Sequence, residues 1–244
     1  MKSILLFFSI FICSLVIGQE VTIGTQVWMT KNLNLDKFRN GELIPQANTH
    51  AEWEQAKENK QPAWCYYDND PKNGTKYGKL YNWYAVNDSR WLAPAGWHVP
   101  TDAEWTTLGK LLGRSDSGKK MKSTSGWNSY TTGGSKTCSN CNDWNAEYRR
   151  KTACHVCKDS RSVPARTVTL SGNGTNTSGF SGLPGGTRDN DGTFGNVGES
   201  GSWWGSVENF TLNAWLRYLD YYPGYVTRYG FNKQKGLSVR CLRD

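Results

Sequence analysis

The sequence predicts a mixed α+β fold with two short helices, antiparallel strands and long irregular loops. The 244 residues include 26 Gly but only 3 Met, and 13% of them are aromatic. This composition is typical of many turns and short strands around an aromatic core, and it argues against a helix bundle. In addition, a capping-box sequence begins each of two stretches whose apolar residues recur at helical spacing.

The first 18 residues are predicted to be a signal peptide. Lys2 precedes an apolar run from Ile4 to Ile17, and Gly18 stands before a polar segment. A charge, a short apolar run and a small residue in this order form a secretory leader. Cleavage after Gly18 leaves 226 of the 244 residues, and the loss of Lys2 lowers the formal charge from +8 to +7. No second apolar run follows, so we expect an exported protein without a membrane span, in the periplasm or outside the cell.

The mature chain, 19–244, is predicted to be a single domain whose first half holds both helices. It opens with two short strands, 21–23 and 26–29, around the turn at Gly24. The sequence 49–52 is a capping box that begins a helix ending before Pro62. Residues 64–67 indicate a buried strand or extended run, and 68–78 are rich in turn residues. Residues 80–86 are compatible with a strand or a helix, and we favour the helix. A second capping box at 101–104 begins the other helix, which Gly113 ends.

The C-terminal part is predicted to consist of strands and turns. Asp191-Gly192 is a hairpin signal. The runs 214–221, 225–231 and 237–242 are strand-like, and we expect them to pair as three consecutive antiparallel strands.

Residues 129–169 form a cysteine-rich insertion within this domain. The segment is polar and poor in aliphatic residues, so it cannot build a core of its own. Cys138, Cys141, Cys154 and Cys157 form two CxxC pairs separated by 12 residues. Two such knuckles can complete a tetrahedral zinc site, whereas an exported protein also favours two disulfides. The sequence leaves both closures open. Cys65 and Cys241 remain outside the insertion, each in a strand-like segment, and can pair with each other.

Five stretches together resemble one family. They are 24–29 (GTQVWM), 77–83 (YGKLYNW), 96–101 (GWHVPT), 179–186 (GFSGLPGG) and 236–241 (GLSVRC). In this order they are similar to the Fibrobacter succinogenes major paralogous domain of exported proteins from Fibrobacter and Bacteroidetes. The resemblance implies a C-type-lectin-like fold with two helices and with both chain ends in one sheet, and it implies no known activity. Many members carry Cys-Pro where this chain has Ala93-Pro94, which leaves Cys65 as the best remaining partner for Cys241.

The sequence predicts a protein that is not an enzyme. It has no GxSxG and no HExxH motif, and only three histidines. Of these, His98 is interpreted as a structural residue bonded to the backbone. The positive charge is spread without a dense Lys/Arg run, which indicates a solvated basic surface and no nucleic-acid partner.

Aromatic residues near the C-terminus carry the functional hypothesis. Aromatic rings stack on sugars, and Tyr and Arg are favoured at protein interfaces. We therefore expect a binding module of the cell envelope that recognises a glycan or a protein, the alternative being a structural envelope protein without a specific ligand. The candidate ligand-binding residues are Trp215, Arg217, Tyr221, Tyr222, Tyr225, Arg228 and Tyr229. Alternation along a strand would put Trp215, Arg217 and Tyr221 on one face and Tyr218 on the other.

Metal analysis with free-thiol counting on the mature protein distinguishes the two closures of the insertion. A zinc site predicts one metal ion per chain and four thiols that become reactive once a chelator has removed the zinc. Two disulfides predict no metal and no reactive thiol among the four CxxC cysteines. Four free thiols without metal in an ordered insertion would contradict both.

Overall fold

The computed structural model of the chain describes residues 20–132, 136–137, 162–163, 168–222 and 224–244. As predicted, the described part is a mixed α+β structure with short helices and small antiparallel sheets. Its helices are α1 (His50–Glu58), the 3-10 helix η1 (Tyr67–Asn69), α2 (Pro71–Tyr77), α3 (Trp83–Val86), α4 (Asp102–Leu111) and α5 (Ser117–Met121).

Both helices expected from capping boxes are confirmed. In α1 the Thr49 side chain accepts a hydrogen bond from the Glu52 backbone, and the Glu52 carboxylate accepts one from the Thr49 backbone. Thr101 and Glu104 form the same reciprocal pair at α4. These bonds satisfy backbone donors that a helix start otherwise leaves open. Gly113 follows α4 with a φ of 80°, a conformation that glycine adopts without strain.

Two sequence expectations for this half are wrong. The turn-rich segment contains α2, because the Asp70 side chain accepts from the Lys72 backbone and Pro71 takes the first helical position. The helix expected over 80–86 is divided into strand β4 (Leu80–Tyr81) and α3. Tyr81 pairs instead with Trp64 of β3 (Trp64–Cys65), and the Asn82 side chain caps α3.

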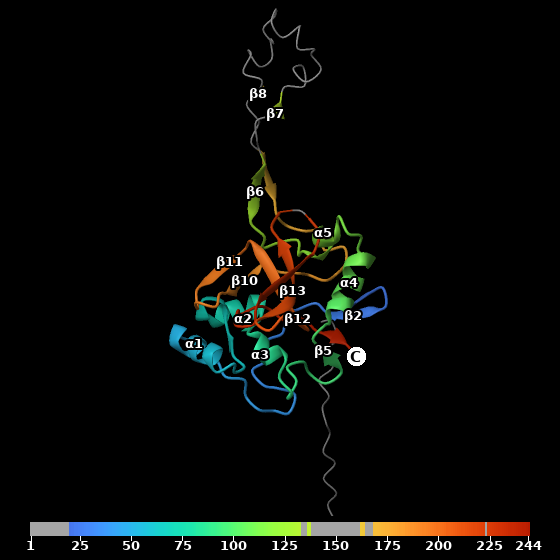
Figure 1. Cartoon of the computed structure of the whole chain (residues 1–244). Helices are drawn as coiled ribbons and strands as arrows, with labels where there is room; N and C mark the ends of the chain where they lie inside the picture. Colours follow the sequence, from blue (N-terminus) through green and yellow to red (C-terminus); the bar gives the residue numbers. More distant parts are fainter. Residues whose placement is uncertain (1–19, 133–135, 138–161, 164–167, 223) are drawn as a thin grey trace, which may run out of the picture.

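A four-stranded sheet joins the two ends of the described chain, as the resemblance implied. Its order is β1-β2-β15-β5, and Figure 1 shows the C-terminus beside β5 and β2. An ion pair between Glu20 and Arg243 adds to this closure. The strands are β1 (Glu20–Ile23), β2 (Gln26–Met29), β5 (Trp97–His98) and β15 (Leu242–Arg243).

A second antiparallel sheet has the order β12-β13-β14. It is built from β12 (Ser200–Asn209), β13 (Asn213–Asp220) and β14 (Thr227–Asn232). The run 237–242, expected as the third of the consecutive strands, is therefore misassigned. It forms single bridges from Leu237 to Tyr81 and from Ser238 to Trp203, and only its last residue enters β15.

The remaining strands form small two-stranded sheets. Asp191-Gly192 lies in the turn between β10 and β11, as predicted. At the insertion, β6 pairs with β9 and β7 with β8, and this stem extends away from the body in Figure 1. The four CxxC cysteines lie outside the described residues. The bounds are β6 (Ser129–Thr132), β7 (Lys136–Thr137), β8 (Ser162–Val163), β9 (Val168–Ser171), β10 (Gly185–Arg188) and β11 (Phe194–Val197).

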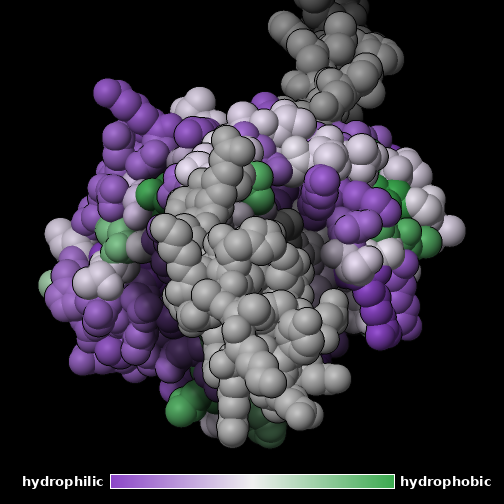
Figure 2. All heavy atoms as spheres, turned by 90° about the horizontal axis from the view of Figure 1, so that it is seen from above, coloured by the Kyte–Doolittle hydropathy of each residue, from purple (hydrophilic) through white to green (hydrophobic). Residues whose placement is uncertain are grey.

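The core is aromatic, as the composition predicted. Trp28, Trp105, Phe180 and Trp203 are fully buried in one cluster, with edge-on and tilted ring contacts. Such contacts between offset or perpendicular rings add to the hydrophobic gain. Seen from above, the described surface is mostly hydrophilic, with hydrophobic residues in small separate patches (Figure 2).

A buried arginine connects the two larger sheets. The guanidinium of Arg240 is 0% exposed and lies 4.3 Å from the Phe180 ring centre. It donates to Asn32 Oδ1 over 2.6 Å from Nη2, and also to the Phe180 carbonyl. Asn32 Oδ1 accepts a further bond from Trp203 Nε1, at 2.8 Å. Burial lowers the pKa of Arg240 below its usual value, because desolvation disfavours the charged form.

The structure contradicts the expected disulfide between Cys65 and Cys241. Both are buried free thiols that pack in different core clusters. Cys65 lies with Trp53 and Leu80, whereas Cys241 lies in the cluster of Trp204. Burial raises the pKa of Cys65 to about 11 and that of Cys241 to about 12, so both remain protonated at neutral pH.

Replacing Asn32→Ala should lower the free energy of unfolding by about 2–4 kcal/mol. The substitution removes the oxygen that serves both Arg240 and Trp203, and a buried charge without its acceptor is costly. Urea denaturation measures the change. The matched control is Asn34→Ala, because Asn34 is exposed, its side chain has no hydrogen bond among the described residues, and its loss should change stability by less than about 0.5 kcal/mol. Equal destabilisation by both variants would contradict this role of Asn32.

Candidate ligand-binding site

The seven residues expected to form one aromatic face do not share a surface. The strand ends at Asp220, so the alternation that was to include Tyr221 stops before it. Strand register then separates the rest, since Arg228 is opposite Arg217 whereas Tyr229 is opposite Leu216. The structure instead places them in four positions. Trp215, Arg217 and Arg228 lie on one face of the sheet, and Tyr229 lies on the other. Tyr221 and Tyr222 follow the end of β13, and Tyr225 precedes β14.

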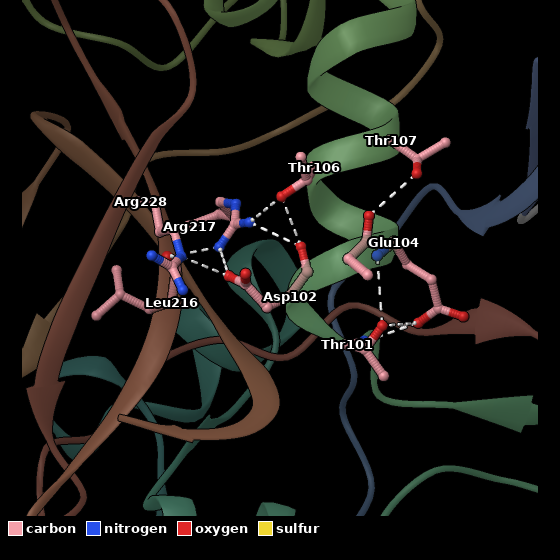
Figure 3. Close-up of polar contacts among 9 residues, drawn as sticks. Thr101, Asp102, Glu104, Thr106, Thr107, Leu216, Arg217 and Arg228 are labelled. Atoms are coloured by element: carbon pink, nitrogen blue, oxygen red, sulfur yellow. Dashed lines mark hydrogen bonds and ion pairs between the residues drawn. The ribbon is translucent and has the colours of Figure 1, made fainter. Parts of the chain in front are cut away.

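Asp102 links the first of these groups to α4. Its Oδ1 accepts from Arg217 Nη1 at 2.9 Å and from Arg228 Nε at 2.7 Å, and Figure 3 shows the carboxylate between the two guanidinium groups. Arg217 also donates to the Asp102 carbonyl and to Thr106 Oγ1. The first helical turn of α4 is therefore bound to the face of β13 and β14.

The same contacts keep the Asp102 carboxylate ionised. Burial by itself would raise the pKa of Asp102, but the hydrogen bonds from Arg228 and Arg217 outweigh it, and the net pKa lies below its usual value of 3.8. Arg217 is only 3% exposed, and its guanidinium donates hydrogen bonds to Asp102 and Thr106. Arg228 is more open, and its guanidinium carbon stacks 3.2 Å from the centre of the Trp215 ring.

A cavity of about 530 Å³ lies beside this group, between α4, α5 and the start of β14. Its floor includes Trp105, which is 1% exposed, and its rim includes Tyr225, which is 62% exposed. The lining residues are Trp105, Thr106, Gly109, Lys110, Arg114, Ser115, Ser117, Arg217, Tyr225, Val226 and Arg228. Three of the seven predicted residues, Arg217, Tyr225 and Arg228, thus meet in one hollow.

Tyr221 and Tyr222 belong to a different contact. Their rings are 4.6 Å apart and pack with Tyr130 of β6 at the base of the insertion stem. Lys122 holds this segment, because its Nζ donates to the carbonyls of Asp220, Tyr221 and Tyr222. Burial lowers the pKa of Lys122 to about 8. These two tyrosines therefore connect the stem to the body.

Tyr229 lies away from the cavity, on the other face of the sheet. Its ring is 5.7 Å from Tyr218 in an edge-on contact and 6.3 Å from Phe231 in a stacked one. Tyr218 faces away from Trp215 and Arg217, as the strand alternation predicted. Because Tyr229 is 48% exposed, it offers a comparison residue for tests of the cavity.

His98 does not bond to the backbone as expected. Its Nδ1 lies 2.8 Å from Asp244 Oδ1, and its Nε2 lies 3.0 Å from Glu104 Oε1. Glu104 is also the third helical residue in the capping box of α4, so His98 connects β5, Asp244 and the helix start. The histidine is not among the residues that line the cavity.

A comparison with protein families assigns the chain. The model of the Fibrobacter succinogenes major domain matches residues 21–243. The chain belongs to this family. The match covers all five stretches on which the resemblance was noted and also spans the insertion. Comparison with curated proteins and with solved structures gave no significant match.

The described part of this Fibrobacter succinogenes major domain holds no group of three or more His, Cys, Asp or Glu that could bind a metal ion. The four cysteines considered for zinc are outside that part. None of the described helices has the length and apolar character needed to cross a membrane.

Sequence reasoning missed most of the residues that surround the cavity. In the sequence Asp102 belongs only to a capping box, whereas in the structure it also binds two arginines from strands more than 100 residues away. Lys110 and Arg114 come at and after the end of α4, where basic residues are common because they complement the helix dipole. No local pattern indicates that β14 would bring Arg228 beside them.

Asp102→Asn should destabilise the domain by about 2 kcal/mol at neutral pH, because buried Arg217 loses its only carboxylate among the described residues. The pKa of Asp102 is lowered in the folded state, so its contribution is present above pH 3.8 and is lost as pH falls through the lowered value. Urea denaturation at several pH values should show the difference between wild type and variant shrinking below about pH 4. The control Asp116→Asn changes an exposed carboxylate that caps nothing. A pH-independent difference for Asp102→Asn would contradict this assignment.

Proposed function

We propose that this domain is an exported, non-enzymatic binding module of the bacterial cell envelope and recognises a glycan in the cavity between α4, α5 and β14. The C-type-lectin-like fold is part of this proposal. It is supported by the sheet that pairs β2 and β5 with the last strand, and by the small sheets and irregular segments between. Export rests on the leader-like first 18 residues.

The observation that carries the proposal is the cavity itself. Its volume of about 530 Å³ falls within the roughly 300–1,000 Å³ of small-ligand sites. The exposed ring of Tyr225 at the rim provides a flat apolar surface of the kind on which sugar rings stack. Hydroxyl and guanidinium groups also line the cavity and can donate hydrogen bonds to sugar oxygens.

The lining residues favour binding over catalysis. Among them are arginines, a lysine, serines, a threonine and a tyrosine, but no carboxylate, histidine or cysteine. A hydrolase or transferase needs a base or a nucleophile activated by one within hydrogen-bond reach of the substrate. Asp102 and His98 have arginine and carboxylate partners, and Asp116, between Ser115 and Ser117 in the sequence, is not among the lining residues.

Tyr225→Ala should weaken glycan binding roughly tenfold, the equivalent of about 1.4 kcal/mol. A glycan array screened with the mature protein identifies the ligand, and calorimetry then compares the variants. Tyr229→Ala is the matched control, because it removes a similarly exposed ring from the opposite face of the sheet. Equal loss in both variants, or binding only to a protein partner, would contradict the assignment. An absence of any ligand would leave the structural envelope role.

A further inference from the structure

Four cationic side chains gather around the largely apolar cavity. Lys110, Arg114, Arg217 and Arg228 all line it, and none of its lining residues is acidic. Among the described residues, the carboxylate bound to this group is that of Asp102, which accepts hydrogen bonds from Arg217 and Arg228. Four positive charges against one negative charge leave a net charge of +3 at the cavity. In a concave site, such an excess attracts and concentrates anions.

Arg228 is positioned as a ligand-binding group. Its Nε bonds to Asp102, and its plane stacks on Trp215 at 3.2 Å. These two contacts fix the guanidinium, whereas its two Nη groups have no hydrogen-bond partner among the described residues. The two Nη groups can donate in parallel to two oxygens of one carboxylate or sulfate, which is the strongest geometry for arginine. Because Asp102 and Trp215 hold Arg228 in place beforehand, little side-chain entropy is lost on binding.

Lys110 and Arg114 reinforce this charge. Within the described part of the chain neither side chain forms an ion pair or a hydrogen bond. The helix dipole accounts for a lysine in the last turn of α4, but not for the convergence of that lysine with Arg114 and with Arg228 from another sheet. These exposed cations repel one another only weakly through water, and an anion bound among them would interact favourably with all of them.

We propose that the cavity binds an anionic glycan, with its carboxylate or sulfate ester held by Arg228, Lys110 and Arg114 and its sugar ring against Tyr225. The inference rests on the proposed function and specifies its ligand class. A sugar acid combines both features of the site, since its ring matches the rim of Tyr225 and Val226 and its anionic group matches the cations. The hollow form of the site favours one or two sugar units over the flat surface of a folded protein.

Calorimetry with three oligosaccharides of similar length tests this proposal. One carries carboxylates (oligogalacturonate), one carries sulfate esters (a sulfated galactan oligomer), and one is neutral (an oligogalactan). We expect binding of at least one anionic oligomer, at least tenfold tighter than that of the neutral one. The two anionic arms identify which anionic group the cavity prefers. Affinity should also fall as salt rises, because ions screen the contact.

Charge variants locate the binding. Arg228→Gln should weaken anionic binding about tenfold or more and reduce its salt dependence, and Arg228→Lys should fall between, because lysine keeps the charge without the paired donors. Arg114→Gln removes a cation that has no structural partner, so it tests the site even if Arg228→Gln is unstable. Lys72→Gln is the control, since Lys72 is an exposed cation of α2 outside the cavity. Urea denaturation verifies that each variant is folded.

The outcomes separate the two proposals. Binding of the neutral oligomer that Tyr225→Ala weakens but Arg228→Gln and Arg114→Gln leave unchanged would overturn the anionic ligand and keep the glycan-binding function. Anionic binding reduced equally by Lys72→Gln would show nonspecific attraction to a basic surface, and would also overturn the inference. An absence of binding to all three oligomers, with no other glycan found on the array, would overturn both proposals.

Discussion

The guanidinium of Arg240 is enclosed by protein, and the arrangement of the domain depends on how its charge is satisfied. Its hydrogen bonds go to the neutral oxygens of Asn32 and of the Phe180 backbone, in segments distant along the chain. Asn32 in turn accepts from Trp203 of β12. A buried cation that lost these acceptors would cost several kcal/mol, so the N-terminal strands, the glycine-rich segment and the central sheet have to assemble together. This requirement gives a physical reason for the Gly-Leu-Ser-Val-Arg-Cys stretch at the end of the chain.

The candidate site rests on the core residues around Arg240. Phe180, which stacks on Arg240, also contacts Trp105, and Trp105 contacts Trp28 at 4.7 Å. These rings pack α4 against the core, and Asp102 binds its first turn to β13 and β14 through two arginines. The lining residues of α4, α5 and β14 therefore lie on regular elements, which helps a binding site to recognise a ligand without reordering itself, whereas Tyr225 and Val226 belong to the segment before β14. Arg217 binds α4 through Asp102. Arg228 also binds Asp102, and in our proposal it binds the ligand as well.

The aromatic residues near the C-terminus have divided roles. Trp203 and Trp204 are core, Tyr221 and Tyr222 attach the insertion stem, Tyr229 covers the far face of the sheet, and Tyr225 alone of the predicted tyrosines lines the cavity. A high local density of aromatic side chains does not by itself mark a binding face, because packing uses the same residue types. The cations at the cavity are the more specific indication, because Asp102 and Trp215 hold Arg228 in place while its two Nη groups have no hydrogen-bond partner among the described residues.

The sequence by itself determined the family and much of the local structure, although not α2 or the division of 80–86 into β4 and α3. Capping boxes at Thr49 and Thr101, the turn at Gly24 and the Asp191-Gly192 hairpin depend on contacts between residues a few positions apart, so they were predicted correctly. The five ordered stretches were enough to indicate the family. Only the tertiary structure decided which distant residues come into contact. Cys65 and Cys241 pack in different core clusters, and β15 pairs with β2 and β5. Lys110 of α4 and Arg228 of β14 line the same cavity. Strand order and register place these residues, and both result from side chains that pack together from distant segments, which no pattern within a short window contains.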